Sequence, residues 1–335
     1  MLVTVLGAGY MGSAMAQVAA MRGHTVRLWG TWLDDDLIAE VEGKRAHPRL
    51  KMPLHASITP FRHAALEDAL KGAELVVHGV SSEGAVPVMT KAAAFVPDVP
   101  IVSVTKGFLP GADGKMHRID QIVAETVGRK LRFVHAAGPA KAIEIARSVL
   151  TWMFFASENI ADARTATDAL GSDFLRITAS DDIAGAEICS AMKNAYATGL
   201  GIWDGLIGPD CHNARAACFQ QAVFEMAALV KAGGGKIETA YAAPGVGDLH
   251  VTAAAGRNRA FGEGVGKGKP AKQVAAEMAA INQLTEGYPA IKSAWRWAQE
   301  HGVSAKELPL LVALHAVVWE DVPVAKAMAS LSLST

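Results

Sequence analysis

Residues 2–12 have the sequence LVTVLGAGYMG, and this stretch decides the fold of the chain. The apolar, β-branched run at residues 2–6 is typical of a buried parallel strand. Gly7, Gly9 and Gly12 follow it directly and open a helix rich in Ala and Met. In this context the glycines predict a dinucleotide-binding turn, because they permit a tight turn, close approach of a pyrophosphate and close helix–strand packing. The helix N-terminus then offers N–H groups to the phosphates.

Strand-like and helix-like segments alternate through the first half of the chain. Four further apolar runs predict strands, at residues 25–29, 74–78, 100–104 and 131–134. Two intervening segments predict helices, at residues 86–95 and 116–127. The alternation predicts an α/β fold in which a Rossmann-like, doubly wound sheet occupies residues 1–182. Helical segments with Gly- and Pro-marked loops follow, so we expect an all-helical substrate and catalytic domain over residues 183–335.

The composition excludes several classes of protein. The chain has 335 residues, 51% hydrophobic and 19% charged, a balance that fits a folded α/β protein with a sizeable core. Because the net charge is −1 and no basic run is present, nucleic-acid binding through a broad positive field is not expected. Residues 2–21 carry no charge, but their glycine pattern argues against a signal peptide or a membrane span. We expect a cytoplasmic protein without a membrane span.

The cysteines and histidines give no sign of a metal site. Cys189, Cys211 and Cys218 lie in apolar segments without metal-type spacing, which predicts buried free thiols. His250 follows Asp248 closely, but a lone neighbour of this kind is expected to be a surface or supporting residue.

The cofactor choice rests on the end of the second strand. Thr31 stands there without the acidic residue that would bind a ribose 2′-hydroxyl, and without an Arg that would hold a 2′-phosphate. The nearby Asp34, Asp35 and Asp36 are interpreted as a solvated helix start, whose negative charge mildly disfavours a 2′-phosphate. We therefore expect NAD or NADP, with a slight preference for NAD.

Residues 245–259 place four kinds of polar group in one glycine-punctuated stretch. These are the carboxylate of Asp248, the hydroxyl of Thr252, the guanidinium of Arg257 and the amide of Asn258. A guanidinium beside an amide suits phosphate or carboxylate oxygens, because its fork donates two parallel hydrogen bonds. A carboxylate nearby suits a proton-transfer network. A polar loop that leads into a capped helix is the alternative.

Two lysines add to this set. Lys106 follows a strand and is expected at the carboxyl edge of the sheet, either as a ligand-binding group or as a solvated lysine. Lys193 lies inside an otherwise apolar helical segment, next to Asn194. A lysine in such company either snorkels to solvent or has a function.

Several motifs in order resemble the soluble NAD(P)-dependent glycerol-3-phosphate dehydrogenases. The similarity extends from Gly7 to about Gly287. The matching motifs are Lys193-Asn194, Asp204-Gly205-Leu206, Asn213-Ala214, Glu225-Met226, Gly247-Asp248-Leu249, Gly256-Arg257-Asn258-Arg259, Phe261-Gly262 and Asn282-Gln283-Leu284-Thr285-Glu286-Gly287. Several coinciding motifs are more specific than any one of them.

The resemblance implies a role for each matching residue. Lys193 would exchange a proton with the substrate's C2 oxygen, and Asp248 would hold and tune its ammonium. The implied substrate-binding residues are Lys106, Asn194, Thr252, Arg257 and Asn258. The implied cofactor-binding residues are Gly7, Gly9, Tyr10, Met11, Gly12, Thr31, Lys106, Ala142, Arg257, Leu284 and Glu286. The resemblance also favours a homodimer that acts on a small phosphorylated substrate.

The chain departs from the family pattern at several positions, among them Ala140 and Gly256. These departures leave open a related phosphorylated polyol, such as a tetritol phosphate. A β-hydroxyacid or 6-phosphogluconate-type dehydrogenase shares the glycine turn and the lysine–asparagine pair. A dinucleotide sensor without turnover is a remote alternative.

Overall fold

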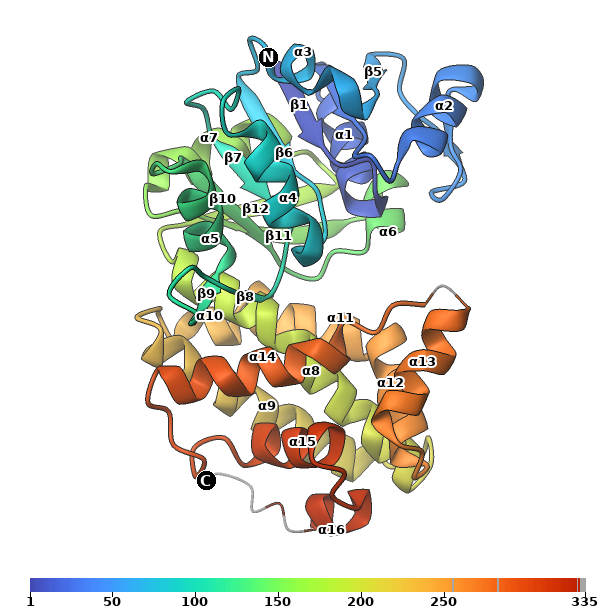
Figure 1. Cartoon of the computed structure of the whole chain (residues 1–335), viewed down its shortest axis with the longest axis vertical. Coiled ribbons are helices and arrows are strands. Elements are labelled where there is room, and N and C mark those ends of the chain that lie inside the picture. The colour runs from blue at the N-terminus through green and yellow to red at the C-terminus, as the bar shows by residue number, and fades with distance from the viewer. Residues whose placement is uncertain (255, 282, 330, 332–335) are drawn as a thin grey trace. The chain divides into compact units, whose positions relative to one another are not determined.

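The chain divides into two compact units (Figure 1). The structure is a computed structural model and describes residues 1–254, 256–281, 283–329 and 331. The first unit comprises residues 1–106 and 119–183, and the second comprises residues 107–118 and 184–335. The predicted single boundary after residue 182 places residues 107–118 in the first unit. The structure places this segment in the second unit instead.

One eight-stranded sheet forms the centre of the first unit. Its strands are β1 (Leu2–Leu6), β2 (Thr25–Trp29), β5 (Ile58–Phe61), β6 (Leu75–His78), β7 (Ile101–Ser103), β10 (Phe133–Ala137), β11 (Thr151–Ala156) and β12 (Leu175–Ser180). The strand order is β12-β11-β10-β7-β6-β1-β2-β5. Neighbouring strands are parallel except for β10 and β11, which are antiparallel. The predicted Rossmann-like sheet is confirmed, with this one reversal.

Burial of β1 explains its near-continuous apolar sequence. The strand lies between β6 and β2, and Leu6 is in register with Trp29 on one side and His78 on the other. Val3, Val5 and Leu6 are fully buried, as expected for a parallel strand whose two faces are covered. The carboxyl ends of β1, β2, β6, β7 and β10 therefore lie at one edge of the sheet.

Helices and one small sheet complete the first unit. The helices are α1 (Tyr10–Met21), α2 (Asp35–Lys44), a 3₁₀ turn (His63–Ala65), α3 (Leu66–Leu70), α4 (Ser82–Ala92), α5 (Ile119–Val127), α6 (Ala142–Ala146) and α7 (Ile160–Leu170). The small sheet pairs β3 (Ala46–His47) with β4 (Met52–Pro53) in antiparallel register.

The described residues of the second unit form helices and one hairpin. Its helices are α8 (Ile183–Leu206), α9 (His212–Ala232), α10 (Glu238–Tyr241), a π turn (Ala243–Gly247), α11 (Asp248–Ala254), α12 (Arg257–Gly266), α13 (Ala271–Ala280), α14 (Gly287–Glu300), α15 (Pro309–Trp319) and α16 (Val324–Ala329). The hairpin pairs β8 (Phe108–Pro110) with β9 (Met116–Arg118).

The hairpin belongs to the second unit because it packs on α14. The ring of Phe108 stacks on Trp297 with centroids 5.0 Å apart, and the backbone N–H of Met116 donates to Glu300 at 2.6 Å. These contacts also explain why the predicted helix over residues 116–127 begins only at Ile119: the first three residues pair with β8 instead.

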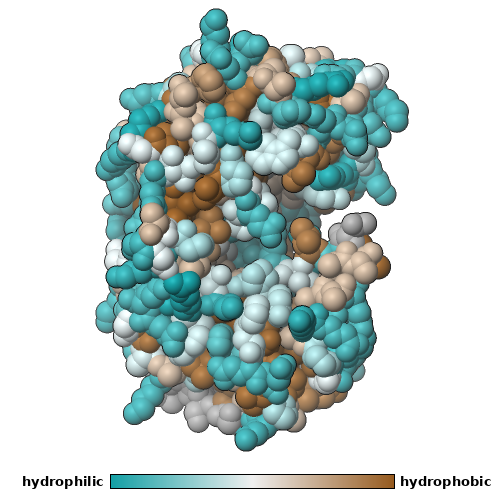
Figure 2. Space-filling view, in the orientation of Figure 1, coloured by the Kyte–Doolittle hydropathy of each residue, from teal (hydrophilic) through white to brown (hydrophobic). Residues whose placement is uncertain are grey.

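The visible surface carries hydrophilic side chains with hydrophobic residues scattered among them (Figure 2). Some apolar exposure of this kind is usual for folded proteins. Among the described residues, no helix combines the length and the apolar character needed to cross a membrane.

Candidate active site

The glycine turn between β1 and α1 has the shape that a dinucleotide requires. Gly7 has a φ of +105°, and a Cβ on Gly12 would collide with the carbonyl oxygen of Gly7. A Cβ on Gly9 would meet no atom within 4 Å, so the turn has open space where a pyrophosphate would approach. Gly9 also precedes the first turn of α1, where N–H groups and the helix dipole attract anions. The residues present therefore fit a dinucleotide cofactor.

The other residues that the sequence assigns to a cofactor in this unit follow parallel strands. Tyr10 and Met11 begin α1 after β1, Thr31 follows β2, Lys106 follows β7, and Ala142 begins α6 after β10. Because these strands point the same way, the residues lie at one edge of the sheet. Ligands of open α/β sheets bind at this carboxyl edge.

At the end of β2, Thr31 is bonded to Asp34. The backbone N–H and the hydroxyl of Thr31 donate to Oδ2 of Asp34 at 3.0 and 2.7 Å, and Asp34 is buried. Asp35 contacts His63, with Oδ2 2.6 Å from Nδ1. The interpretation of a solvated acidic helix start is therefore wrong for Asp34, because its carboxylate is used inside the turn.

A buried polar group holds the chain just before Lys106. The hydroxyl of Thr105 donates to the carbonyl oxygen of Val80 at 2.8 Å, which ties the exit of β7 to the loop after β6. The imidazole of His78 lies 3.0 Å from the hydroxyl of Ser103 through Nδ1. Burial lowers the pKa of His78 to about 4, so this group supports the loop as a neutral ring.

In the second unit, α8 and α11 bring Lys193 and Asp248 together. Nζ of Lys193 donates to Oδ1 of Asp248 at 2.5 Å, and the two side chains are 12% and 1% exposed. The hydroxyl of Thr252, one turn further along α11, lies 3.4 Å from the same carboxylate oxygen. A nearly buried ammonium is thus held by a fully buried carboxylate.

A chain of hydrogen bonds extends this cluster to α12 and to the start of α14. Nδ2 of Asn258 donates to Oδ1 of Asn194 at 2.9 Å, and the backbone N–H of Gly287 donates to Oδ1 of Asn258 at 2.9 Å. Nδ2 of Asn194 donates to Oε2 of Glu286 at 3.1 Å. Nη2 of Arg257 lies 3.7 Å from Oε1 of Glu286, and both side chains are about half exposed.

Glycines on α8 and α12 explain how Asn194 and Asn258 meet. A Cβ on Gly201 would collide with the carbonyl oxygen of Arg259, and a Cβ on Gly262 would collide with that of Thr198. The two helices therefore touch backbone to backbone. Sequence reasoning missed this contact, although each helix carries two glycines four residues apart, Gly201 with Gly205 and Gly262 with Gly266.

Two buried acids join α8 to neighbouring helices. Oδ2 of Asp204 accepts from Nε of Arg259 at 2.6 Å. The carboxylate of Glu225 accepts from the hydroxyl of Tyr196 at 2.9 Å and from the N–H groups of Leu310 and Leu311 at the start of α15, at 2.6 and 2.9 Å. Burial raises the pKa of Glu225 to about 7, against the opposing effect of these donors.

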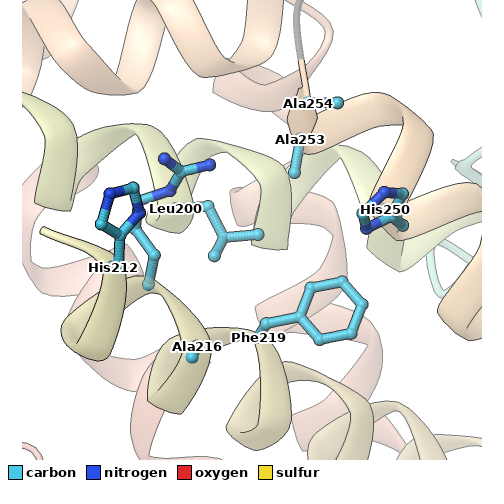
Figure 3. Close-up of a pocket in the computed structure, with 8 residues that line it drawn as sticks. Leu200, His212, Ala216, Phe219, His250, Ala253 and Ala254 are labelled. Carbon is cyan, nitrogen blue, oxygen red and sulfur yellow. The ribbon is translucent and has the colours of Figure 1, made fainter. Parts of the chain in front are cut away.

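A separate cavity of about 390 Å³ lies between α8, α9 and α11 (Figure 3). Leu200 and Phe219 form part of its apolar lining, and His212 and His250 stand at its sides. The ring of His250 packs edge-on against Phe219 with centroids 6.3 Å apart. His250 therefore lines this cavity. Lys193 and Asp248 are not among its lining residues.

The structure links most of the residues that the sequence assigns to the helical unit. One set of contacts joins Lys193 to Asp248 and Asp248 to Thr252. A second set joins Asn194 to Asn258 and to Glu286, and Glu286 to Arg257. Leu284 is 64% exposed. Ala255, in the stretch 245–259, and Asn282, in the last of the quoted motifs, lie outside the described residues.

Cys189, Cys211 and Cys218 are buried thiols. Within the residues that the structure describes, no group of three or more His, Cys, Asp or Glu side chains is arranged to hold a metal ion.

Comparison with known proteins identifies the family. Residues 2–163 match the N-terminal domain of NAD-dependent glycerol-3-phosphate dehydrogenase, and residues 182–329 match its C-terminal domain. The NADP(+)-dependent glycerol-3-phosphate dehydrogenase of Archaeoglobus fulgidus is 31% identical, with 99% of both chains covered. A glycerol-3-phosphate dehydrogenase of Thiobacillus denitrificans, named for NAD(P)+, is 35% identical over 99% of this chain and 97% of its own.

A solved structure agrees with these matches. The crystal structure of glycerol-3-phosphate dehydrogenase from Coxiella burnetii has a TM-score of 0.84 and 29% identity, over 98% of this chain and 97% of its own. The alternative dehydrogenase families that the sequence left open are not favoured by these relatives. The chain belongs to the NAD-dependent glycerol-3-phosphate dehydrogenase family.

Proposed function

We propose that the chain reversibly transfers a hydride between NAD(H) or NADP(H) and C2 of a three-carbon substrate, reducing dihydroxyacetone phosphate to sn-glycerol 3-phosphate. The observation that carries the proposal is the buried Lys193–Asp248 pair, linked by neighbouring helices to Arg257 and Asn258. The names of the full-length relatives support the reaction and its cofactors.

The first unit binds the cofactor, which supplies or accepts the hydride at C4 of its nicotinamide ring. The glycine turn holds the pyrophosphate, with Gly7, Gly9 and Gly12 shaping the backbone. Tyr10, Met11, Thr31, Lys106 and Ala142 line the same edge of the sheet and complete this site.

Lys193 is the general acid and base. When a hydride adds to the carbonyl carbon, negative charge develops on the C2 oxygen, and the ammonium of Lys193 stabilises that charge and donates the proton. In the oxidising direction the neutral amine takes the proton back from the C2 hydroxyl. Asp248 holds the ammonium in place at 2.5 Å, and Thr252 steadies the carboxylate.

The phosphate is bound at the start of α12. Arg257 supplies the guanidinium fork and Asn258 the neighbouring amide. The contact between Arg257 and Glu286 is 3.7 Å long, which exceeds hydrogen-bond distance, so a phosphate can replace this weak partner. Lys106 and Asn194 orient the substrate, and Leu284 and Glu286 contribute to cofactor binding.

A spectrophotometric assay tests this proposal. Oxidation of NADH and of NADPH is followed with dihydroxyacetone phosphate and, in parallel, with four-carbon ketose phosphates. We expect turnover with the three-carbon substrate. Lys193→Ala should lose turnover by ~10²–10⁴-fold and keep its cofactor affinity, since the lysine acts as acid and base. The control Lys267→Ala removes an exposed lysine directly after the C-terminal end of α12 and should leave turnover unchanged.

The assay also decides between outcomes. Near-normal turnover in Lys193→Ala would overturn the assigned role, and faster turnover with a four-carbon substrate would overturn the assigned substrate. Equilibrium titrations with both cofactors establish whether NAD is preferred.

The assembly and the location complete the proposal. We propose a homodimer because the second unit exposes several large apolar side chains, among them Ile207 at 61% and Tyr241 at 51%. Light scattering after gel filtration would refute this if it gave the mass of one chain. We propose a cytoplasmic location because three reduced thiols suit a reducing compartment.

A further inference from the structure

His47 is a buried histidine whose two ring nitrogens both have partners. It lies on β3 in the small hairpin after α2 and is fully buried. Nε2 lies 3.0 Å from the carbonyl oxygen of Ala8, within the dinucleotide turn. Nδ1 accepts a hydrogen bond from the backbone N–H of Leu50 at 3.0 Å.

These partners define the tautomer of the ring. A backbone N–H only donates, so Nδ1 of His47 must present a lone pair to Leu50. The ring proton then sits on Nε2 and is donated to Ala8, which only accepts. Burial lowers the pKa of His47, so the neutral ring that this arrangement requires is also the favoured one.

The carbonyl oxygen of Ala8 receives a second donor from α1. The hydroxyl of Ser13 donates to it at 3.1 Å, so two buried side chains hold one oxygen. The peptide bond between Ala8 and Gly9 is planar and trans, so its N–H points opposite to its C=O. Fixing the oxygen therefore fixes the direction of the Gly9 N–H, at the residue beside which the turn has open space.

The hairpin that carries His47 is itself firmly attached. The guanidinium of Arg45 donates to the carbonyl oxygens of Ile58 and His55, both at 3.0 Å. Beyond β4, the backbone N–H of His55 donates to Oε1 of Gln17 on α1 at 2.9 Å. The imidazole is thus held from both ends of the hairpin.

We propose that His47 is a positioning residue for the cofactor: through the carbonyl of Ala8 it orients the Gly9 N–H toward the pyrophosphate. The inference rests on dinucleotide binding at this turn, as set out above. Hydrogen bonds to the oxygen also polarise the same peptide unit, which strengthens its N–H as a donor.

Two variants separate the nitrogens of His47. In His47→Gln the amide nitrogen is as many bonds from the backbone as Nε2, so the donor to Ala8 is kept and the acceptor for Leu50 is lost. In His47→Asn the amide oxygen can replace Nδ1 as acceptor, and the donor to Ala8 is lost. We expect the Kd for NADH or NADPH to rise ~10-fold in His47→Asn and by less than ~3-fold in His47→Gln, since a net hydrogen bond contributes about that factor.

Kd is measured by fluorescence titration without a substrate, and Tm is measured beside it. If His47 only stabilises the fold, both variants should have a lower Tm and the same Kd as the unaltered chain. That result would overturn the proposal. Equal loss of affinity in the two variants, or a greater loss in His47→Gln, would also overturn it.

Ser13→Ala gives a second test if His47→Asn does not fold. It removes the other donor to Ala8 by deleting one hydroxyl, and we expect the Kd to rise ~3-fold. An unchanged Kd would contradict the proposed role of this carbonyl. If the unaltered chain binds neither cofactor, the proposed function itself fails; if it binds and the variants match it, only the inference about His47 fails.

Discussion

Asp248→Asn tests the buried ion pair of the helical unit. The substitution keeps the shape of the side chain and removes its charge, so the ammonium of Lys193, which is only 12% exposed, loses the carboxylate that lies 2.5 Å from it. We expect a less stable and slower protein. Its affinity for the cofactor should not change, because the glycine turn belongs to the other unit.

The burial of the pair sets the size of the effect. At an effective dielectric constant of about 20, two unit charges 2.5 Å apart attract by about 7 kcal/mol. Lost hydration offsets much of this, because the side chains are 12% and 1% exposed. Removing one partner of a buried pair costs about 3–5 kcal/mol, since the other charge stays buried and loses the opposite charge that compensated it. For a unit of this size, Tm should fall by about 10 °C.

Denaturant and thermal unfolding measure this loss, with an exposed pair as control. Glu263→Gln breaks the contact with Lys267, whose side chain is 58% exposed, and should cost less than about 1 kcal/mol. The double variant Lys193→Met, Asp248→Asn removes both charges and should regain most of the stability. Turnover in Asp248→Asn should fall ~10²-fold, because the lysine loses its fixed position. A stability loss in Asp248→Asn no larger than that of the control would refute the reasoning.

Three further predictions concern the same unit. The pKa of Glu225 is raised to about 7, so its stabilising contribution is complete below the pKa of the unfolded chain and is lost as pH rises through 7. The free energy of unfolding should therefore fall by up to about 3 kcal/mol between pH 5 and pH 8. In denaturant titrations, Glu225→Gln should lack this fall. Gly262→Ala should lower the free energy of unfolding by about 1–3 kcal/mol and lower kcat/KM, because the new Cβ meets the carbonyl oxygen of Thr198. The control Gly43→Ala adds a Cβ in open space on α2 and should raise the free energy of unfolding by about 0.5–1 kcal/mol. Equal Tm values for the two variants would contradict the close helix contact. Arg257→Lys keeps the charge but loses the fork, so KM for the phosphorylated substrate should rise ~10-fold, and an unchanged KM would exclude Arg257 from phosphate binding.

The first elements of the fold could be predicted because their signals are local. The apolar runs at residues 2–6 and 25–29 match β1 and β2, and the glycines between β1 and α1 stand where backbone sterics require them. The sequence also predicted the change from an α/β to a helical texture near residue 183. These features depend on hydrophobic pattern and turn chemistry within a few residues.

Other elements depend on distant partners and could not be predicted in this way. Residues 151–156 form β11, whose apolar sequence does not specify that it runs antiparallel to β10. Residues 116–118 look like the start of an amphipathic helix, yet they pair with β8 because Phe108 stacks on Trp297 far along the chain. Pairing across such separations leaves no local pattern.

The candidate site divides along the same line. Motif resemblance pointed to Lys193 and Asp248, which are 55 residues apart and do meet. It gave no indication of the bond from Gly287 to Asn258 or of the glycine contact between α8 and α12, because backbone groups and absent side chains carry no chemical signature. His47 was missed for a related reason: its partner is a backbone oxygen.

Both units use buried neutral groups to orient the backbone or amides around the regions that we propose bind ligands. In the first unit His47 and Ser13 hold the carbonyl of Ala8, and in the second Asn258 joins Asn194 to the N–H of Gly287. A neutral group with complete hydrogen bonds costs less to bury than a charge does. It also leaves little net charge to compete for an anion. Arg257, about half exposed with a carboxylate 3.7 Å away, can then exchange that partner for a phosphate. We infer that the buried groups provide geometry and the exposed charge provides affinity, so His47→Asn should raise the Kd for the cofactor and Arg257→Lys should raise the KM for the phosphorylated substrate.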